Sequence, residues 1–339
     1  MAKIDLKKRQ QQLEHRGQFA VDMNEQHRTF DALDIDDGYE YLPKKFTERF
    51  RRLWLLSVVK VVGPVLTWFA AGTKVVGKKN LRAVKGRGAI SVCSHTHTLD
   101  TLMVKQALGP FRTFHTGSYY LLKRGWFGKL FKAGGFIPVS MKVHDIRNLQ
   151  NAVGTLVERG KIVNFYPEHA LWPRYEKVRP FQAGAFRYAV KFGAPVVPLF
   201  IEYRETALRR FFRMKKKAVV HILPAMEAPE GSAERERAAA LSDAVYAAMK
   251  AKYEEVYGKP LVYDIQPQEE SGAVQTESAP AAGADKDSQR AGNPPARRAG
   301  KRAEKRAEKR AEKRARKKER GERRVSAAPE ETPCAENAE

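Results

Sequence analysis

A histidine and an aspartate five positions apart follow a short apolar run in this chain. The β-prone run ends at Cys93, and residues 94–100 then supply two histidines, three hydroxyl side chains and an acid. A strand that leads into a polar turn presents such groups at the carboxyl edge of a sheet, where ligands collect in α/β proteins. An acid bonded to one imidazole nitrogen fixes the tautomer, so His95 with Asp100 could act as a general base for a hydroxyl. A helix-capping pair is the structural alternative.

His97 opens a second interpretation of the same segment. Two imidazoles from one loop, followed by an acid, are also how metallo-hydrolases present their ligands. Such a site would use His95, His97 and Asp100, although no further histidine follows directly to complete the cluster. We keep a metal-dependent hydrolase as the alternative hypothesis, and otherwise expect no metal site and a polar His97 on the rim.

A second polar turn follows the apolar run at 162–166. Glu168 comes directly after this predicted strand, at the same sheet edge as His95. It could hydrogen-bond an acceptor hydroxyl or orient basic groups that hold phosphate; alternatively it caps Arg174 or Arg179. Further basic residues could bind an anionic head group or form a solvated face: Lys177, Arg179, Arg187 and Lys191.

The elements that must position these groups alternate along the chain between residues 74 and 257. Apolar runs predict strands within 74–93 and 111–121, and at 136–139, 162–166, 195–203 and 219–223. Amphipathic spacing predicts helices at 101–108, 126–131, 145–159, 184–192 and 232–257. This alternation predicts a layered α/β domain.

The N-terminal part of the chain has two different characters. Residues 1–41 are polar and predict a loosely attached helix and linker, whereas 42–73 are apolar at helical spacing with interleaved basic residues. The run 53–72 is long enough to span a bilayer, but Lys60 and the Gly63-Pro64 break lie in its middle. We therefore predict two short membrane-associating helices bent at Gly63-Pro64, with a single span or a buried, proline-broken core helix as alternatives.

The net charge of +24 is concentrated near the C-terminus. Residues 297–324 contain sixteen Lys and Arg against five Glu, a net of +11, within a four-residue repeat that has no apolar face. We predict a disordered tail over 261–339 whose basic repeat adds affinity for an anionic lipid surface. Nucleic-acid binding by the tail is less favoured because no aromatic residues are interleaved for base stacking.

Four blocks, in order, resemble the glycerolipid acyltransferases that make phosphatidic acid from lysophosphatidic acid. SHTHTLD (94–100) resembles the family's Asn-His-x-x-x-x-Asp block, and GGFIPVS (134–140) its Gly-x-x-Phe-Ile-x-Arg block. NFYPEHALW (164–172) is similar to the Phe-Pro-Glu-Gly-Thr-Arg block, and the stretch 181–201 to the family's lysine/glycine helix and Val-Pro strand. The resemblance covers roughly residues 74–225.

This resemblance implies a mixed sheet flanked by helices, an acyltransferase domain over 74–260, and His95 as general base with Asp100 as its partner. It implies substrate contacts from Glu168, Gly184 and the residues near two family arginines. Ser140 stands at the first arginine position, with Lys142 two residues on. The second arginine is missing from the third block, and Arg174 could replace it from further along the loop.

The same resemblance implies the partners and the location of the reaction. The co-substrate would be acyl-CoA or acyl carrier protein, without a further cofactor, and the acceptor would be a lysophospholipid. The enzyme would work on a phospholipid membrane, at the cytoplasmic face of the cell membrane, as a peripheral or monotopic protein. Because the family arginines are replaced, the acceptor head group stays open.

Overall fold

The computed structural model describes residues 5–23, 39–119, 122, 126–139, 143–231 and 233–266. They belong to one compact unit that covers residues 1–271. The disordered tail predicted over 261–339 begins too early: residues 261–266 are described, and Leu261 is buried in the core while the Asp264 amide donates to Glu14 at 3.0 Å. The rest of the predicted tail, from residue 267 on, lies outside the described residues, as do Ser140 and Lys142.

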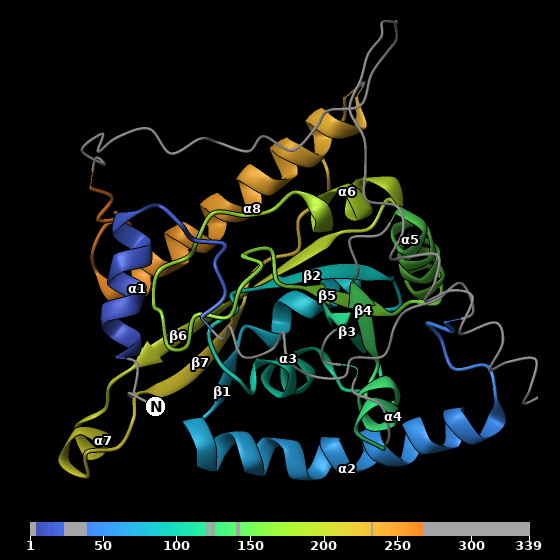
Figure 1. Cartoon of the computed structure of the whole chain (residues 1–339), viewed down its shortest axis with the longest axis horizontal. Helices are drawn as coiled ribbons and strands as arrows, with labels where there is room; N and C mark the ends of the chain where they lie inside the picture. The colour runs from blue at the N-terminus through green and yellow to red at the C-terminus, as the bar shows by residue number, and fades with distance from the viewer. Residues whose placement is uncertain are drawn as a thin grey trace, which may run out of the picture. The chain divides into compact units, whose positions relative to one another are not determined.

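A seven-stranded mixed sheet lies at the centre of this unit, in the order β1-β7-β6-β2-β5-β3-β4 (Figure 1). All neighbouring strands are parallel except β6 and β7, which are antiparallel. The strands are β1 (Lys74–Val76), β2 (Ala89–Cys93), β3 (Thr113–Ser118), β4 (Phe136–Val139), β5 (Ile162–Phe165), β6 (Val196–Arg204) and β7 (Lys217–Ile222). The predicted α/β class with a mixed sheet is confirmed.

Helices cover both faces of the sheet. They are α1 (Leu6–His15), α2 (Phe46–Ala71), the 3-10 helix η2 (Lys78–Val84), α3 (Asp100–Leu108), α4 (Trp126–Ala133), α5 (Val143–Glu158), α6 (Gly184–Lys191), α7 (Ala207–Phe211) and α8 (Glu234–Tyr257). One core cluster joins the sheet to α5, α6 and α8, and a second joins it to α2 and α3. Because β2 and β5 are buried on both faces, they read as nearly continuous apolar runs in the sequence, each with one polar residue, Ser91 or Asn164.

The expected bend at Gly63-Pro64 is wrong: α2 is one helix of 26 residues with Pro64 inside it. Its buried residues Leu56, Gly63, Thr67 and Ala71 form one stripe at helical spacing that passes through the proline position. The Thr67 hydroxyl on this stripe donates to Gln106 of α3 at 2.9 Å. A bend would break the stripe, so packing on α3 holds the helix together.

Large apolar side chains are exposed along the rest of α2. Its exposed residues include Phe46, Phe50, Leu53, Trp54, Val61, Val65, Trp68 and Phe69. Within the described residues, α2 is the one helix long and apolar enough to cross a membrane by length and composition. Because little of α2 is covered by protein, the alternative of a buried core helix is wrong.

We expected a loosely attached N-terminal segment because the segment is polar. Its described residues 5–23 are instead packed on the domain. Leu13, Phe19 and Met23 are buried in a third cluster with Trp172 and its neighbours. The Gln10 side chain also donates to the Pro173 carbonyl at 2.8 Å. Residues 5–23 therefore form a strap that packs on the loop after β5.

Candidate active site

The predicted histidine–aspartate pair is assembled in the turn between β2 and α3. His95 Nδ1 lies 2.5 Å from Asp100 Oδ2. Asp100 begins α3 and is 2% exposed, whereas the His95 side chain keeps 22% of its surface exposed. A carboxylate only accepts hydrogen bonds, so this contact assigns the proton to Nδ1 and leaves Nε2 as the acceptor nitrogen.

Tyr166 completes this pair, and the sequence analysis did not identify it. It follows β5, which lies beside β2 in the sheet. Its ring stacks on the His95 ring with centroids 4.0 Å apart, and its hydroxyl donates to Asp100 Oδ1 at 2.9 Å. Burial, and then the Asp100 charge, raise the pKa of the Tyr166 hydroxyl, so it stays a hydrogen-bond donor. Tyr166 thus fixes both members of the pair.

The backbone of the turn is bonded to the sheet and to the loop after β5. The Ser94 hydroxyl accepts from the Ile201 amide at 3.1 Å, and the Tyr203 hydroxyl donates to the Thr96 carbonyl at 2.7 Å. From the loop, the Trp172 amide donates to the His95 carbonyl at 3.0 Å. The histidine is therefore held by its main chain as well as by its side chain.

Glu168 lies behind His95 in a fully buried ion pair. Its Oε2 accepts from the His95 amide at 3.1 Å and from Arg179 Nη2 at 2.7 Å, and its Oε1 accepts from the Arg179 amide at 3.0 Å. Both side chains of the pair are 0% exposed. Both oxygens are thus occupied by donors of the protein, which supports the capping alternative with Arg179 and not acceptor binding by Glu168.

Arg179 in turn ties three segments together. Its guanidinium donates to the carbonyls of Ala170, Phe19 and His95 at 2.5, 3.0 and 3.3 Å. It also lies 4.9 Å from the centre of the Trp172 ring. Arg179 therefore joins the turn, the loop after β5 and the N-terminal strap.

The other predicted substrate residues are placed differently. The Arg174 amide donates to the Thr96 carbonyl at 2.7 Å, but its side chain donates to the Lys216 carbonyl at 3.2 Å. Lys177 pairs with Glu14 of the strap. Gly184 begins α6, and a Cβ there would meet no atom within 4 Å.

His97 belongs to the turn and not to a visible ligand cluster. Its Nδ1 accepts from the Leu99 amide at 3.0 Å, and burial together with Arg174 lowers its pKa. Within the described parts of the chain, no group of three or more His, Cys, Asp or Glu side chains could hold a metal ion. The geometry therefore gives His97 a local role in shaping the turn.

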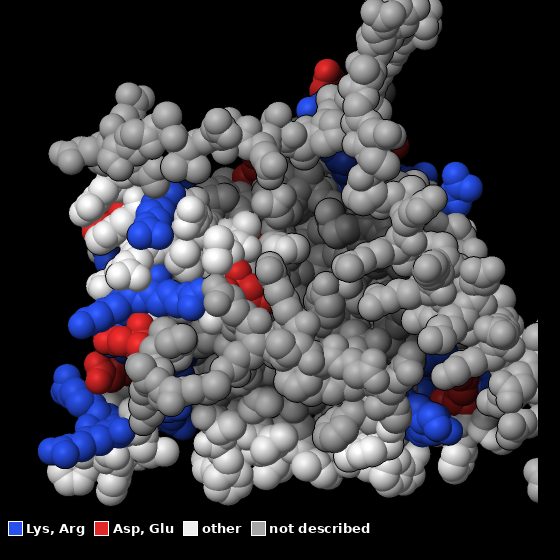
Figure 2. All heavy atoms as spheres, in the orientation of Figure 1, with Lys and Arg blue, Asp and Glu red and all other residues white. Residues whose placement is uncertain are grey.

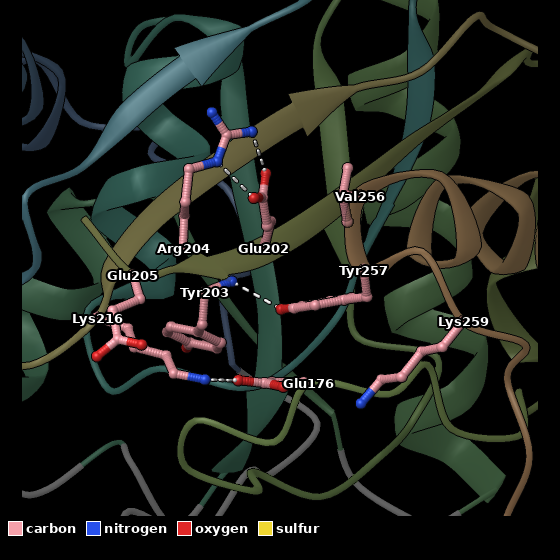
Figure 3. A pocket seen from close by; sticks show the side chains of 9 residues that line it. All are labelled: Glu176, Glu202, Tyr203, Arg204, Glu205, Lys216, Val256, Tyr257 and Lys259. Atoms are coloured by element: carbon pink, nitrogen blue, oxygen red, sulfur yellow. Dashed lines mark hydrogen bonds and ion pairs between the residues drawn. The ribbon is translucent and has the colours of Figure 1, made fainter. Parts of the chain in front are cut away.

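An open pocket of about 330 Å³ lies near this region, between β6, the end of α8 and the loop after β5 (Figure 3). Its charged side chains bond to one another: Arg204 to Glu202 at 2.7 Å and Lys216 to Glu176 at 2.6 Å. Tyr203 lines it and also contacts Thr96, so the pocket shares one residue with the support of the turn. His95 does not line it.

The comparisons with known proteins give a family match and a similar solved structure. A search of curated proteins gives no match. Among solved structures, the chain is similar to the crystal structure of the 1-acyl-sn-glycerophosphate (LPA) acyltransferase PlsC from Thermotoga maritima, at 19% identity and a TM-score of 0.47. That match covers 61% of this chain and 82% of the other. The family described as Acyltransferase matches residues 72–202, which include His95, Asp100 and Glu168. Residues 72–202 therefore match an acyltransferase domain, which supports an acyltransferase enzyme.

Proposed function

We propose that this acyltransferase is a lysophospholipid O-acyltransferase of phospholipid biosynthesis. It would move an acyl chain from acyl-CoA or acyl carrier protein to a hydroxyl of a glycerol(phospho)lipid. The observation that carries the proposal is the His95–Asp100 pair, with Nδ1 bonded to the carboxylate and the ring partly exposed. Within the described residues no hydrogen bond occupies His95 Nε2, which can therefore accept the hydroxyl proton.

In the proposed reaction the acceptor hydroxyl loses its proton to His95 Nε2 as its oxygen attacks the thioester carbonyl carbon. Asp100 stabilises the imidazolium that forms, and Tyr166 holds the carboxylate in place. The tetrahedral intermediate then breaks its carbon–sulfur bond, and the imidazolium returns the proton to the departing thiolate. The products are an ester and a free thiol, and no nucleophilic side chain or metal is required.

The exposed apolar surface of α2 supports the proposal that the enzyme binds a membrane. Large apolar side chains cover this helix, and Trp54 and Trp68 lie at its two halves, as aromatic residues do at the head-group level. We propose that α2 lies in the interface at the cytoplasmic face, where an acceptor with a buried acyl chain can present its hydroxyl. A single span by α2 is the alternative arrangement.

The test is acyl transfer from a labelled acyl thioester to a panel of lysophospholipids. His95→Ala is expected to abolish transfer and Asp100→Asn to lower it by several orders of magnitude, with unchanged circular dichroism. Normal turnover in either variant would refute the general-base mechanism. The preferred acceptor would identify the head group, and comparison of acyl-CoA with acyl carrier protein would identify the donor.

His97→Asn is the matched control for the histidine substitution. An asparagine side chain can still accept from the Leu99 amide, so the turn is preserved while the imidazole is removed. We expect this variant to keep most of the activity, and we expect transfer to survive a metal chelator. Loss of activity on chelation, with stoichiometric metal in the purified protein, would contradict the mechanism.

A further inference from the structure

The turn between β6 and β7 carries a second group of exposed apolar side chains. Residues 206–216, here named the β6–β7 tip, contain the short helix α7. Phe211 and Phe212 are 80% and 62% exposed, and Leu208 and Met214 are also exposed. A soluble surface seldom keeps four large apolar side chains exposed in one short segment, so this tip needs a partner.

Basic residues alternate with these apolar ones, and the tip contains no acid. Arg210, Arg213 and Lys215 are exposed. Arg209 is instead directed inward, with one guanidinium nitrogen 2.8 Å from the Lys215 carbonyl. The tip therefore presents aromatic and cationic side chains together, a combination that suits the interface of an anionic bilayer.

The tip lies beside the C-terminal end of α2 (Figure 1). A Cβ at Gly72, which follows α2, would lie 2.3 Å from the Arg209 guanidinium, so the two segments are in contact. Figure 2 shows Lys and Arg side chains gathered at the end of the molecule where Figure 1 places α7. The tip is thus continuous with the apolar surface of α2.

The base of the tip is bonded to the candidate active site. The Lys216 carbonyl accepts from the Arg174 side chain at 3.2 Å, and the Arg174 amide bonds to the Thr96 carbonyl beside His95. A bilayer that holds the tip would therefore hold an element attached to the turn that carries the histidine.

We propose that the β6–β7 tip is a second anchor for anionic phospholipid membranes, separate from α2, which fixes the orientation of His95 toward the bilayer. This inference rests on the proposed membrane function. A second contact beside the C-terminal end of α2 restricts the rotation about its own axis that α2 alone leaves free. The bilayer is preferred to a protein partner because the tip's cations and aromatics alternate and because the adjoining surface of α2 is apolar as well.

The first test measures binding of the full chain to vesicles by sedimentation, with and without anionic lipid. Arg210→Ala/Arg213→Ala is expected to weaken binding to anionic vesicles about 30-fold, at roughly fivefold per basic residue near the surface. Binding to neutral phosphatidylcholine vesicles is expected to stay within about twofold. Arg159→Ala/Arg235→Ala, at exposed residues next to the end of α5 and on α8, is the matched control.

The apolar part of the tip is tested by Phe211→Ser/Phe212→Ser. We expect this variant to bind both kinds of vesicle at least roughly tenfold less tightly, because each ring loses its burial in lipid. Val262→Ser, at an exposed apolar residue far from α7 in the sequence, is the control and is expected to bind normally. Unchanged binding in both tip variants would count against the anchor.

If α2 alone binds vesicles tightly, the tip variants change the overall affinity little. A dye that reports depth in the bilayer then tests the tip directly. An environment-sensitive dye is attached at Leu208→Cys or at the control Val262→Cys, in a Cys334→Ser background, with Cys93 protected by burial. In vesicle-bound protein, quenching by lipid-borne quenchers is expected at position 208 only. A dye at 208 that stays in water on bound protein would overturn the proposal. Both measurements are independent of catalysis, so absence of acyl transfer would refute the proposed function without affecting this result.

Discussion

The buried pair of Glu168 and Arg179 offers the sharpest test of how the site is held. If Glu168 bound the acceptor, Glu168→Gln would raise the KM for the lysophospholipid and leave the free energy of unfolding nearly unchanged. The structure predicts the opposite. Both Glu168 oxygens are engaged by the protein, one of them by the His95 amide, and both side chains are fully buried.

The magnitude follows from the bonds that each substitution leaves behind. Removal of one partner from a buried ion pair costs about 3–5 kcal/mol, because the other charge stays buried without compensation. Glu168→Gln leaves Arg179 its three carbonyl acceptors, so we expect a loss of about 3 kcal/mol. Arg179→Met removes those bonds as well and strands the carboxylate, so we expect about 5 kcal/mol.

The assay is urea unfolding of the purified enzyme in mild detergent, followed by circular dichroism. In the double variant Glu168→Gln/Arg179→Met no unpaired charge stays buried. Its loss in free energy of unfolding is therefore expected to be smaller than the sum of the two single losses by at least about 2 kcal/mol. Glu176→Gln is the control, since its partly exposed pair with Lys216 should contribute no more than about 1 kcal/mol.

The kinetic consequence separates the two hypotheses. Because Glu168 and Arg179 hold the main chain on either side of His95, their loss is expected to lower kcat about 10- to 100-fold with little change in KM. This reasoning would be refuted by a Glu168→Gln enzyme whose free energy of unfolding is within about 0.5 kcal/mol of the wild-type value and whose main defect is a higher KM for the acceptor.

Three further predictions concern single side chains. Tyr166→Phe keeps the ring stack but loses the bond to Asp100, so kcat is expected to fall about fivefold to tenfold, at about 1 kcal/mol for one hydrogen bond, with KM unchanged in steady-state assays. Burial, aided by nearby cations, lowers the pKa of His115 in the folded protein. The free energy of unfolding therefore falls as the pH drops below about 6.5, the pKa of histidine in an unfolded chain. His115→Leu should remove about 1.4 kcal/mol of the loss in unfolding free energy between pH 7.5 and 5.5, in denaturation curves at the two pH values; an unchanged pH dependence would contradict the assignment. Gly88→Ala should fail to fold stably because its Cβ would lie 1.9 Å from a carbonyl oxygen. Gly184→Ala should have a free energy of unfolding within about 0.5 kcal/mol of the wild-type value. A loss of activity in Gly184→Ala would therefore assign Gly184 to substrate contact.

The order of helices and strands could be predicted because most strands between residues 74 and 223 are apolar and bounded by turn residues. The observed bounds of β4 and β6 differ from the predicted ones by at most one residue. The bend at Gly63-Pro64 was predicted wrongly because propensity ignores packing, and the contact of α2 with α3 outweighs the cost of the proline. The helix α7 was missed because five residues carry no period.

Site residues that depend on local contacts could be predicted from the sequence, and those that depend on distant contacts could not. His95 and Asp100 could be predicted as a pair because they lie in one turn. Tyr166 could not, because its contact depends on the pairing of β2 with β5. The function of Arg179 was equally hidden, since its carbonyl acceptors come from segments up to 160 residues away.

The third block departs from the family pattern at His169 and at Trp172, and Trp172 packs against the N-terminal strap. His169 stands where the family block has Gly, and it keeps the left-handed backbone that glycine favours, with φ of 69°. A non-glycine residue pays about 1 kcal/mol or more in that region, although histidine is among those that tolerate it. Trp172, in the same block, is fully buried, and its indole nitrogen donates to the Val21 carbonyl of the strap at 3.0 Å. Without the strap this large side chain would face water, and Trp172 and Arg179, which both bond to the His95 carbonyl, would lose the Val21 and Phe19 carbonyls that they donate to. The polar N-terminal segment is thus a structural part of the site, which a resemblance confined to residues 74–225 did not reveal.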